Sequence, residues 1–430
     1  MKVLLVIHGY PKRYNAGSEV YTQTLAHALQ DLGCEVEVFA REQNPFLPDY
    51  QITTESDPIR EDIPVHLINH ARSNARFQNN AIDKKFKDLI DSIKPDIIHF
   101  GHLNHLSMSL PKVAKQAGVS TLFTLHDFMF MCPRGQFLQW GLSKNSPWEL
   151  CSGQNNAKCA EKCFNRFIEG INVEQELQNW EKWVENRMAL SREASRNIDL
   201  FLSPSRRLMK RHIEEFGIPE ERIIYLDYGF DHTRLKGRMR TNEQKFVFGY
   251  IGRHHPSKGI HHLIDAFALL NGDPILRIWG RSEGQLSKSL ARKTQEFENV
   301  SERVEWMPEY DNQNIVKDVF DNCDCIVVPS IWDENSPLVI HEAQQCEVPV
   351  ITANHGGMGE YVQNDVNGYT FIHRNIESLE KAMQKAFDNP RKITELGKKG
   401  YLYSTDGKIP SIIDHAKSII SQYKQLVKGV

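Results

Sequence analysis

Short apolar runs alternate with longer amphipathic segments along most of this 430-residue chain. The alternation is typical of parallel sheets with helices on both faces, because a strand buried on both sides is apolar throughout. In the first half, strands are predicted over residues 2–7, 35–40, 97–100, 120–125 and 200–202. The pattern restarts in the second half, with strands predicted over 246–251, 275–279, 304–306, 325–328 and 348–352. The expected fold class is α/β, with two doubly wound Rossmann-like domains facing one another across a cleft.

A polar, basic stretch without apolar periodicity separates the two halves, and we place a linker at residues 229–245. The predicted domains are therefore 1–228 and 246–405. Residues 406–430 contain apolar positions at helical spacing from Ile412 to Val427. They predict an amphipathic helix that packs on a domain, and we expect it to return to the N-terminal one.

Charge and composition exclude several classes of protein. The 52 lysines and arginines nearly balance the 55 aspartates and glutamates, which argues against a nucleic-acid partner. The apolar run at residues 1–9 is too short for a signal peptide, and no run is long enough to span a membrane. We expect a cytoplasmic protein with its eight cysteines mostly reduced. A basic segment at 83–90 leaves peripheral association with the inner face of the membrane open.

The stretch 332–343 carries two glutamates, Glu334 and Glu342, on either side of a helix-start signal. Ser336 is a good N-cap, and Pro337 suits the first helical position because its missing N–H would be unpaired there. Backbone N–H groups around Leu338 and Val339 would then bind an anion between two carboxylates. Such a site suits a ligand with phosphates and several hydroxyls, for example a nucleotide sugar.

The loop from Gly252 to Gly259 follows the strand that opens the second half. Its two cations, Arg253 and Lys258, could straddle a diphosphate and stabilise it as it departs. The competing interpretation is a solvated loop with ordinary surface charges. We favour the diphosphate site because the Glu334 loop lies nearby in the predicted sheet.

Three further features follow predicted strands. His126 and Asp127 end the 120–125 strand, where an imidazole could contact the transferred group or its phosphate, although a lone histidine is often structural. Gly17 lies in a polar loop before a helix predicted over 20–30, where a glycine lets the backbone approach a phosphate, or simply caps the helix. The turn at 356–360 is glycine-rich and could either approach a ligand or serve as a flexible turn.

Half of the cysteines lie within a short irregular segment, namely Cys132, Cys151, Cys159 and Cys163. Four thiolates are a reasonable structural zinc set. The spacing lacks the paired C-x2-C motifs that make zinc sites specific. An iron–sulfur cluster, disulfides and four unrelated thiols therefore remain open.

Together, these motifs resemble the retaining glycosyltransferases of family four, glycosyl transferases group 1, which have the GT-B fold. The resemblance covers nearly the whole chain and is strongest over residues 246–371, including the 252–259 loop, the 356–360 turn and residues 367–369. It implies an acceptor-binding domain at 1–228, with a cysteine-rich insertion at 132–163 that is not general to the family. It also implies a nucleotide-sugar-binding domain at 246–405.

The resemblance implies a role for each matching residue. Arg253 and Lys258 would bind the donor diphosphate, and His126 would lie near the anomeric carbon. Glu334 would bind a sugar hydroxyl and Glu342 the ribose. The remaining implied donor contacts are Gly17, Gly252, Arg281, Met307, Asn335, Ser336, Pro337, Leu338 and Val339. The chain has Ala16-Gly17 where such enzymes often have two glycines, which weakens the phosphate role of Gly17.

The resemblance also implies the reaction. A hexose would move from a nucleoside diphosphate, UDP by default, to a hydroxyl of a glycan or lipid-linked acceptor with retained configuration. No catalytic metal or other cofactor would be required, so the only metal expected is the structural zinc. The alternatives are a nucleotide-sugar epimerase of the same architecture and a non-catalytic polysaccharide-assembly protein with a donor-like site.

Overall fold

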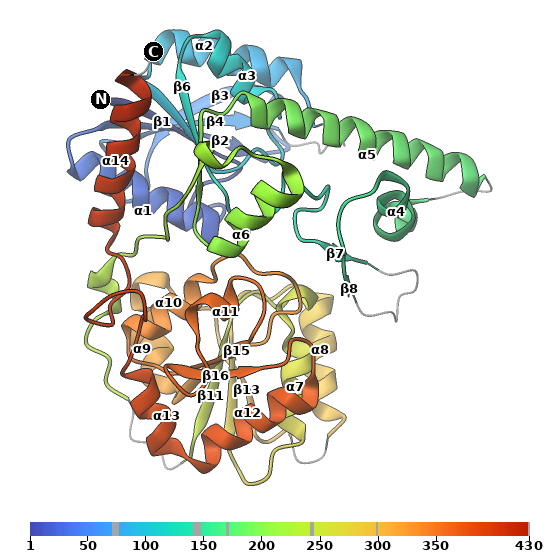
Figure 1. The fold of residues 1–430 in the computed structure, drawn as a ribbon, viewed down its shortest axis with the longest axis vertical. Helices are drawn as coiled ribbons and strands as arrows, with labels where there is room; N and C mark the ends of the chain where they lie inside the picture. The colour runs from blue at the N-terminus through green and yellow to red at the C-terminus, as the bar shows by residue number, and fades with distance from the viewer. Residues whose placement is uncertain (71–76, 141–147, 169–171, 241–244, 298–299, 429–430) are drawn as a thin grey trace. The chain divides into compact units, whose positions relative to one another are not determined.

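Two parallel sheets form the centres of two compact units in the computed structural model (Figure 1). The structure describes residues 1–70, 77–140, 148–168, 172–240, 245–297 and 300–428. Unit 1 comprises Met1–Ser146, Cys151–Phe230 and Pro410–Val430. Unit 2 comprises Pro147–Leu150 and Asp231–Ile409.

Unit 1 has an eight-stranded sheet in the order β10-β9-β6-β5-β1-β2-β4-β3, in which only the edge strand β3 is antiparallel to its neighbour. Its strands are β1 (Lys2–Ile7), β2 (Glu35–Glu42), β3 (Ile52–Ser56), β4 (Pro64–Asn69), β5 (Ile97–Phe100), β6 (Ser120–Thr124), β9 (Leu200–Ser203) and β10 (Ile223–Tyr225). Its longer helices are α1 (Gly17–Asp31), α2 (Asn80–Ile93), α3 (Leu110–Gln116), α5 (Val173–Arg196), α6 (Arg206–Arg211) and α14 (Ile412–Lys428).

Unit 2 has a six-stranded parallel sheet in the order β13-β12-β11-β14-β15-β16. Its strands are β11 (Val247–Ile251), β12 (Ile275–Trp279), β13 (Val304–Trp306), β14 (Cys325–Val328), β15 (Val350–Ala353) and β16 (Gly368–Phe371). Its helices are α7 (Ile260–Ala268), α8 (Gln285–Gln295), α9 (Ile315–Asp318), α10 (Leu338–Gln345), α11 (Met358–Tyr361), α12 (Ile376–Asp388) and α13 (Pro390–Gly397).

The cysteine-rich insertion contributes only short elements. These are β7 (Leu138–Gln139), α4 (Asn156–Cys159), one turn of π-helix (Ala160–Phe164) and one turn of 3-10 helix (Asn165–Phe167) in unit 1, and β8 (Glu149–Leu150) in unit 2. Regular structure is thus sparse between Cys132 and α5, and side-chain packing must hold this segment in place.

The predicted α/β fold class is confirmed, and each predicted strand is present. The strand predicted over 348–352 begins two residues later, at Val350, after a proline that has no N–H to donate to the sheet. Six strands of the described residues were missed, namely β3, β4, β10, β16 and the two-residue strands β7 and β8. The edge strand β3 is largely exposed, so it lacks an apolar run.

The stretch predicted as a linker lies mostly in unit 2, because its arginines bind that unit. Arg240 pairs with Asp324 through Nε and Nη2, at 2.9 and 2.7 Å from the two carboxylate oxygens. Arg238 donates to the backbone carbonyls of Phe320 and Cys323. The chain crosses between the units at Phe230–Asp231 and at Ile409–Pro410, and it also enters unit 2 briefly before Cys151. Residues 241–244 of the predicted linker lie outside the described residues.

The C-terminal helix α14 packs within unit 1 against α1 and β6 (Figure 1). Its buried face includes Ile412, Ala416 and Ile419. Two polar contacts fasten it: Tyr423 Oη lies 2.6 Å from His99 Nδ1, and His415 Nε2 lies 2.7 Å from Tyr21 Oη. A segment encoded after all of unit 2 therefore completes the core of unit 1.

Candidate active site

The candidate residues of unit 2 lie on loops that follow the carboxyl ends of its parallel strands. Such ends meet at one edge of a sheet, where ligands bind in doubly wound folds. The 252–259 loop follows β11, the Glu334 loop follows β14, and the 356–357 turn follows β15. Since β11, β14 and β15 are neighbours, the three loops are adjacent.

Lys258 and Glu334 form an ion pair, with Lys258 Nζ 2.6 Å from Glu334 Oε1. The same oxygen accepts a hydrogen bond from Ser330 Oγ at 2.6 Å. The side chain of Glu334 is 7% exposed and that of Lys258 is 32% exposed, so the cation faces solvent more than its partner does. The 252–259 loop packs closely on Pro329 because residue 259 is glycine. Its φ is +72°, and a Cβ at this position would lie 1.9 Å from the Pro329 carbonyl oxygen.

Arg253 does not share this partner. Its guanidinium pairs with Glu283, with Arg253 Nε 2.7 Å from Glu283 Oε1, and its side chain is 56% exposed. The two cations of the loop thus bind different carboxylates in the absence of a ligand. Their predicted joint contact with a diphosphate stays a prediction.

Glu342 lies in the second turn of α10 and pairs with Arg234, a residue that we did not predict. Arg234 Nη2 lies 2.5 Å from Glu342 Oε1, and both side chains are about 90% buried. Burial opposes the charge of Arg234, but Glu342 outweighs it and raises the pKa of the guanidinium. A carboxylate held in this way is fixed in position and keeps a second oxygen for a ligand hydroxyl.

Helix α10 starts one residue later than predicted. Leu338 is the first helical residue, Pro337 is the N-cap, and Ser336 lies one residue before the cap. The reason is that Pro337 has an extended ψ of 113°. Because no side chain of the cap residue accepts a bond from this helix, the first backbone N–H groups depend on other partners.

The 356–357 turn supports the Glu334 loop rather than acting as a flexible turn. Gly357 N donates to the Glu334 carbonyl at 2.7 Å. A Cβ on Gly357 would lie 1.2 Å from the Asn335 carbonyl oxygen, and one on Gly356 would lie 2.5 Å from Asp333 Oδ1. Only glycines allow this approach, and it buries Glu334 and Asn335.

Two predicted base-binding positions lie at the ends of β12 and β13. The carbonyl of Arg281, an exposed residue, accepts a hydrogen bond from His254 N at 3.1 Å. Met307 N donates to the Ile278 carbonyl at 2.9 Å. A Cβ on Gly280 would lie 1.9 Å from the Gly252 carbonyl oxygen, so the turn before Arg281 packs on the turn after β11. Their ligand contacts stay predictions.

In unit 1, three histidines follow three neighbouring strands: His8 after β1, His102 after β5 and His126 after β6. His126 Nδ1 lies 2.6 Å from Tyr228 Oη. Its Nε2 atom is buried without a hydrogen-bond partner among the described residues. Burial, and then the nearby His102, lower the pKa of His126 to about 3. The imidazole is therefore neutral at physiological pH, with one nitrogen held and the other unused.

Carboxylates orient the other two histidines. His8 Nε2 lies 3.3 Å from Glu19 Oε1, and His102 Nε2 lies 3.3 Å from Asp127 Oδ2. Burial would raise the pKa of Glu19, but hydrogen bonds from His8 and Ser18 lower it to about 2. His126 was selected because it follows the end of a predicted strand, and the same reasoning applies to His8 and His102. No sequence signal indicated Tyr228.

Gly17 is the first residue of α1, so the predicted loop at this position is wrong. The helix starts at Gly17 rather than near Val20 because Ala16 already adopts the extended conformation of an N-cap. The side chain of Ala16 cannot cap the helix, so its first N–H groups have no side-chain acceptor there. The phosphate contact of Gly17 stays a prediction.

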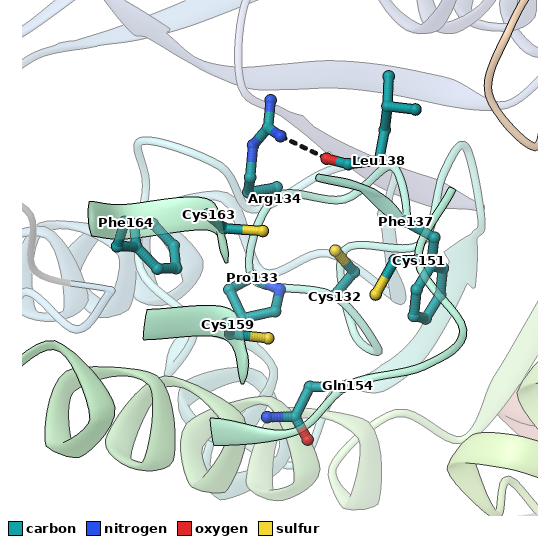
Figure 2. Close-up of a pocket in the computed structure, with 10 residues that line it drawn as sticks. All are labelled: Cys132, Pro133, Arg134, Phe137, Leu138, Cys151, Gln154, Cys159, Cys163 and Phe164. Carbon is teal, nitrogen blue, oxygen red and sulfur yellow. Dashed lines mark hydrogen bonds between the residues drawn. The ribbon is translucent and has the colours of Figure 1, made fainter. Parts of the chain in front are cut away.

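The four cysteines of the insertion line one small pocket in unit 1 (Figure 2). All four are free thiols. As placed, no group of three or more His, Cys, Asp or Glu side chains in the described residues could hold a metal ion. The predicted zinc site is thus untested by the structure, and we return to it below.

Two family descriptions match the chain. "Glycosyltransferase Family 4" matches residues 15–234, and "Glycosyl transferases group 1" matches residues 231–403. The D-inositol 3-phosphate glycosyltransferase of Rhodococcus jostii (strain RHA1) is 28% identical over 199 residues, which cover 43% of this chain and 44% of that protein. The putative colanic acid biosynthesis glycosyltransferase WcaL of Escherichia coli (strain K12) is 25% identical over 194 residues, which cover 43% and 47%. The chain spans about half the length of these curated relatives.

Solved structures share the fold over the whole chain. Sucrose-phosphate synthase from Thermosynechococcus elongatus has a TM-score of 0.70 at 17% identity and covers 100% of both chains. Anabaena Alr3699/HepE, solved in complex with UDP and glucose, has a TM-score of 0.68 at 17% identity and covers 99% of this chain and 100% of that one. Among the described residues, no helix combines the length and apolar content needed to cross a membrane.

Proposed function

Because this chain belongs to glycosyltransferase family 4, we propose that it transfers a hexose from a UDP-sugar to an acceptor hydroxyl with retained anomeric configuration. The observation that carries the proposal is the Lys258–Glu334 pair at 2.6 Å, in which Glu334 lies on the loop that leads into the N-terminus of α10. A cation, a carboxylate and the first backbone N–H groups of a helix are groups that bind a phosphate joined to a sugar.

The charges of the site form mutual pairs that a donor would rearrange. In the proposal, the diphosphate takes the place of Glu334 as the partner of Lys258, and Glu334 turns to a sugar hydroxyl. Glu342 keeps Arg234 on one oxygen and offers the other to the ribose. The donor therefore meets groups that are already ordered by their neighbours, which lowers the entropy lost on binding.

In the proposed reaction, the bond between the anomeric carbon and the phosphate oxygen breaks as the acceptor oxygen bonds to the same face of that carbon. The acceptor proton passes to the departing phosphate oxygen, so the products are the glycoside and UDP. Negative charge grows on the leaving phosphate, where Lys258, Arg253 and the N–H groups at Leu338 would stabilise it. These groups would make a catalytic metal unnecessary. Neutral His126 would contact the transferred sugar through Nε2.

The donor and acceptor classes are supported by relatives. HepE was solved with UDP and with UDP-glucose, which favours UDP over GDP for this chain. WcaL is named for colanic acid biosynthesis, and this favours a growing glycan as the acceptor. A lipid-linked glycan would place the enzyme at the inner face of the membrane, and binding to anionic vesicles checks that extension.

The test uses the purified chain with UDP-glucose, UDP-galactose, UDP-N-acetylglucosamine and GDP-mannose. We expect a thermal shift with one UDP-sugar, UDP release that rises when a glycan acceptor is added, and a product whose anomeric coupling in NMR matches the donor. An epimerase would instead convert the donor without acceptor. A non-catalytic protein would bind donor without releasing UDP, and either result would overturn the proposal.

A further inference from the structure

The cysteine cavity of the insertion has no part in the proposed reaction. Figure 2 shows the side chains of Cys132 and Cys151 on one side of the cavity and those of Cys159 and Cys163 on the other, with all four sulfurs directed into the shared space. The remaining lining residues are Pro133, Arg134, Phe137, Leu138, Gln154 and Phe164. Four thiols are thus the principal ligands that this cavity offers.

Two of the thiols are presented by tight backbone turns. Cys132 begins a turn that Gly135 closes, with Gly135 N 2.9 Å from the Cys132 carbonyl oxygen and a φ of +74° that favours glycine. Cys151 is tied to the same segment, because its N–H donates to the Phe137 carbonyl at 2.7 Å. These backbone bonds hold the two sulfurs at the cavity although the segment has almost no regular structure.

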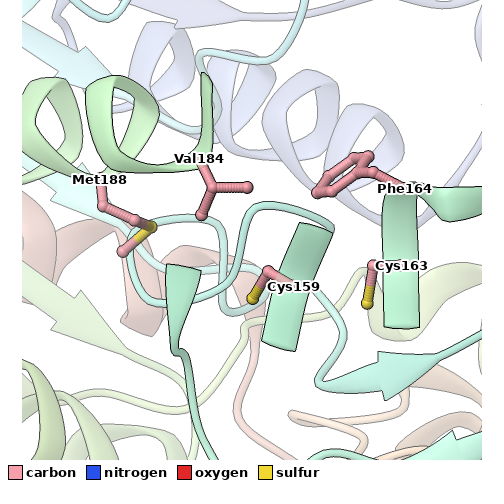
Figure 3. Packing of buried hydrophobic residues seen from close by; sticks show 5 residues of the cluster. All are labelled: Cys159, Cys163, Phe164, Val184 and Met188. Carbon is pink, nitrogen blue, oxygen red and sulfur yellow. The ribbon is translucent and has the colours of Figure 1, made fainter. Parts of the chain in front are cut away.

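The other two thiols lie four residues apart, where α4 continues as a π-helix. In a π-helix, residues four apart lie nearly on one face, and such turns occur often at functional sites. Cys159 and Cys163 pack with Phe164 against Val184 and Met188 of α5 (Figure 3). Phe164 also stacks on Trp180, with ring centroids 4.9 Å apart.

Core packing alone accounts for part of this arrangement. Small thiols are common core residues, and Cys159 and Cys163 belong to an apolar cluster. Packing does not explain why Cys132 and Cys151, from the turn and from the loop, bring two more sulfurs to the same cavity.

The charges around the cavity give an independent observation. Arg187 of α5 is 4% exposed, and its Nε and Nη1 atoms have no hydrogen-bond partner among the described residues. Its Nη2 donates to the Met129 carbonyl, and its guanidinium carbon lies 4.5 Å from the centre of the Phe77 ring. Cys132 and Asp127 are the acidic groups that act on its charge. Arg134 interacts with Cys163 on the other side. A buried cation with unused donors indicates that a negative charge belongs nearby.

We propose that Cys132, Cys151, Cys159 and Cys163 bind one Zn²⁺ ion as four thiolates and thereby fasten the insertion to α5. Each thiol loses its proton to water as its sulfur bonds to the ion, and nothing is oxidised or reduced. The resulting tetrathiolate centre carries net negative charge, which Arg187 and Arg134 neutralise. The sulfurs surround the cavity without meeting at a common point, so they close on the ion when it binds, as is usual for structural zinc.

The first experiment measures metal in the purified wild-type chain, expressed with zinc and handled under reducing conditions. We expect about one zinc per chain by elemental mass spectrometry. A mercurial reagent should release this zinc as it titrates the four thiols of the site. Replacement by Co²⁺ should give the thiolate charge-transfer absorption of a tetrahedral sulfur site. These readouts use the folded wild-type protein and do not depend on catalysis.

Variants then assign the ligands. Cys159→Ser and Cys163→Ser should each reduce the zinc content to a small fraction of that of the wild type, while Cys346→Ser, a buried thiol of unit 2, should leave it unchanged. Arg187→Met keeps all four sulfurs and should weaken zinc binding about 10- to 100-fold in chelator competition, as loss of an outer contact does. Circular dichroism and donor-induced thermal shift check that each variant is folded.

Three results would overturn the proposal. Iron with acid-labile sulfide in the wild type would mean an iron–sulfur cluster instead. A metal-free protein whose mass is below that of the fully reduced chain, by the hydrogens lost in forming one or two disulfides, would mean oxidised cysteine pairs. Reduced, folded protein without metal after incubation with zinc would mean four thiols that serve packing alone.

Discussion

The Lys258–Glu334 pair gives the sharpest test of the proposed donor site. Lys258→Ala removes the ammonium that lies 2.6 Å from Glu334 and leaves the carboxylate with Ser330 as its hydrogen-bond donor. If the ammonium stabilises the leaving phosphate, its loss costs about 2.7–4 kcal/mol of transition-state stabilisation, which is a 10²- to 10³-fold lower kcat. The ion pair is partly exposed, so the free energy of unfolding should fall by only about 1 kcal/mol. The melting temperature should then fall by about 2–4 °C.

The assay follows UDP release at saturating donor and acceptor, beside a thermal melt of the same sample. Lys245→Ala is the matched control, since Lys245 also forms an ion pair in unit 2, with Nζ 3.1 Å from Asp273 Oδ2, but lies on the half-exposed surface. We expect wild-type turnover from the control. Turnover of Lys258→Ala within about twofold of wild type would refute the reasoning, because no charge-stabilising contact of this kind is worth so little.

Three further predictions rest on other contacts. Arg234→Ala leaves Glu342 buried without its cation and should lower the free energy of unfolding by about 3–5 kcal/mol in urea denaturation. Burial and then the nearby His102 lower the pKa of His126 from its ordinary value of 6.5 to about 3, so it resists protonation only in the folded state. The wild type should therefore lose stability relative to His126→Gln as pH falls from 6.5 toward 3, and the two should differ by a constant amount above pH 7. Gly357→Ala places a Cβ on the Asn335 carbonyl and should abolish the donor-induced thermal shift.

Matched variants separate these effects from general damage. Glu342→Gln with Arg234 intact should lose less stability than Arg234→Ala. The only buried charge left without its ion-pair partner in this variant is the Arg234 guanidinium, which is still hydrogen-bonded. Gly237 has a positive φ, +74°, unlike Gly357 with φ -68°, but a Cβ on Gly237 would meet nothing within 4 Å. Gly237→Ala should therefore cost about 1–2 kcal/mol and keep donor binding. Equal damage from both glycine variants would contradict the packing argument, and an unchanged pH dependence in His126→Gln would contradict the histidine argument.

The strands of this fold were predictable because most of them are buried on both faces. Burial of every residue in β14 makes it a continuous apolar run that the sequence displays directly, and in β5 only His99 interrupts such a run. The edge strand β3 has polar, exposed residues and so resembles a loop. The stretch after Phe230 was misread for a related reason: its arginines look like solvated linker charges, yet Arg238 and Arg240 bind groups more than 80 residues away.

The candidate site was predictable in position but not in pairing. The ends of β11 and β14 pointed to Lys258 and Glu334, since neighbouring parallel strands bring their carboxyl ends to one edge of the sheet in unit 2. The end of β6 in unit 1 pointed to His126 in the same way. Which partner each charge takes depends on the folded geometry. Glu342 meets Arg234 across 108 residues, and His126 meets Tyr228 across 102, and no spacing rule encodes either contact.

The return of α14 to unit 1 has a consequence for biogenesis. The buried hydroxyl of Tyr21 and the ring of His99 obtain their partners, His415 and Tyr423, only after more than 170 intervening residues of unit 2 have been translated. Until then, the nascent first half presents an uncovered apolar groove along α1 and β6. A fragment ending near residue 230 would keep that groove exposed and aggregate, whereas a circular permutant that starts at 410 would supply the missing helix before the strands that it covers.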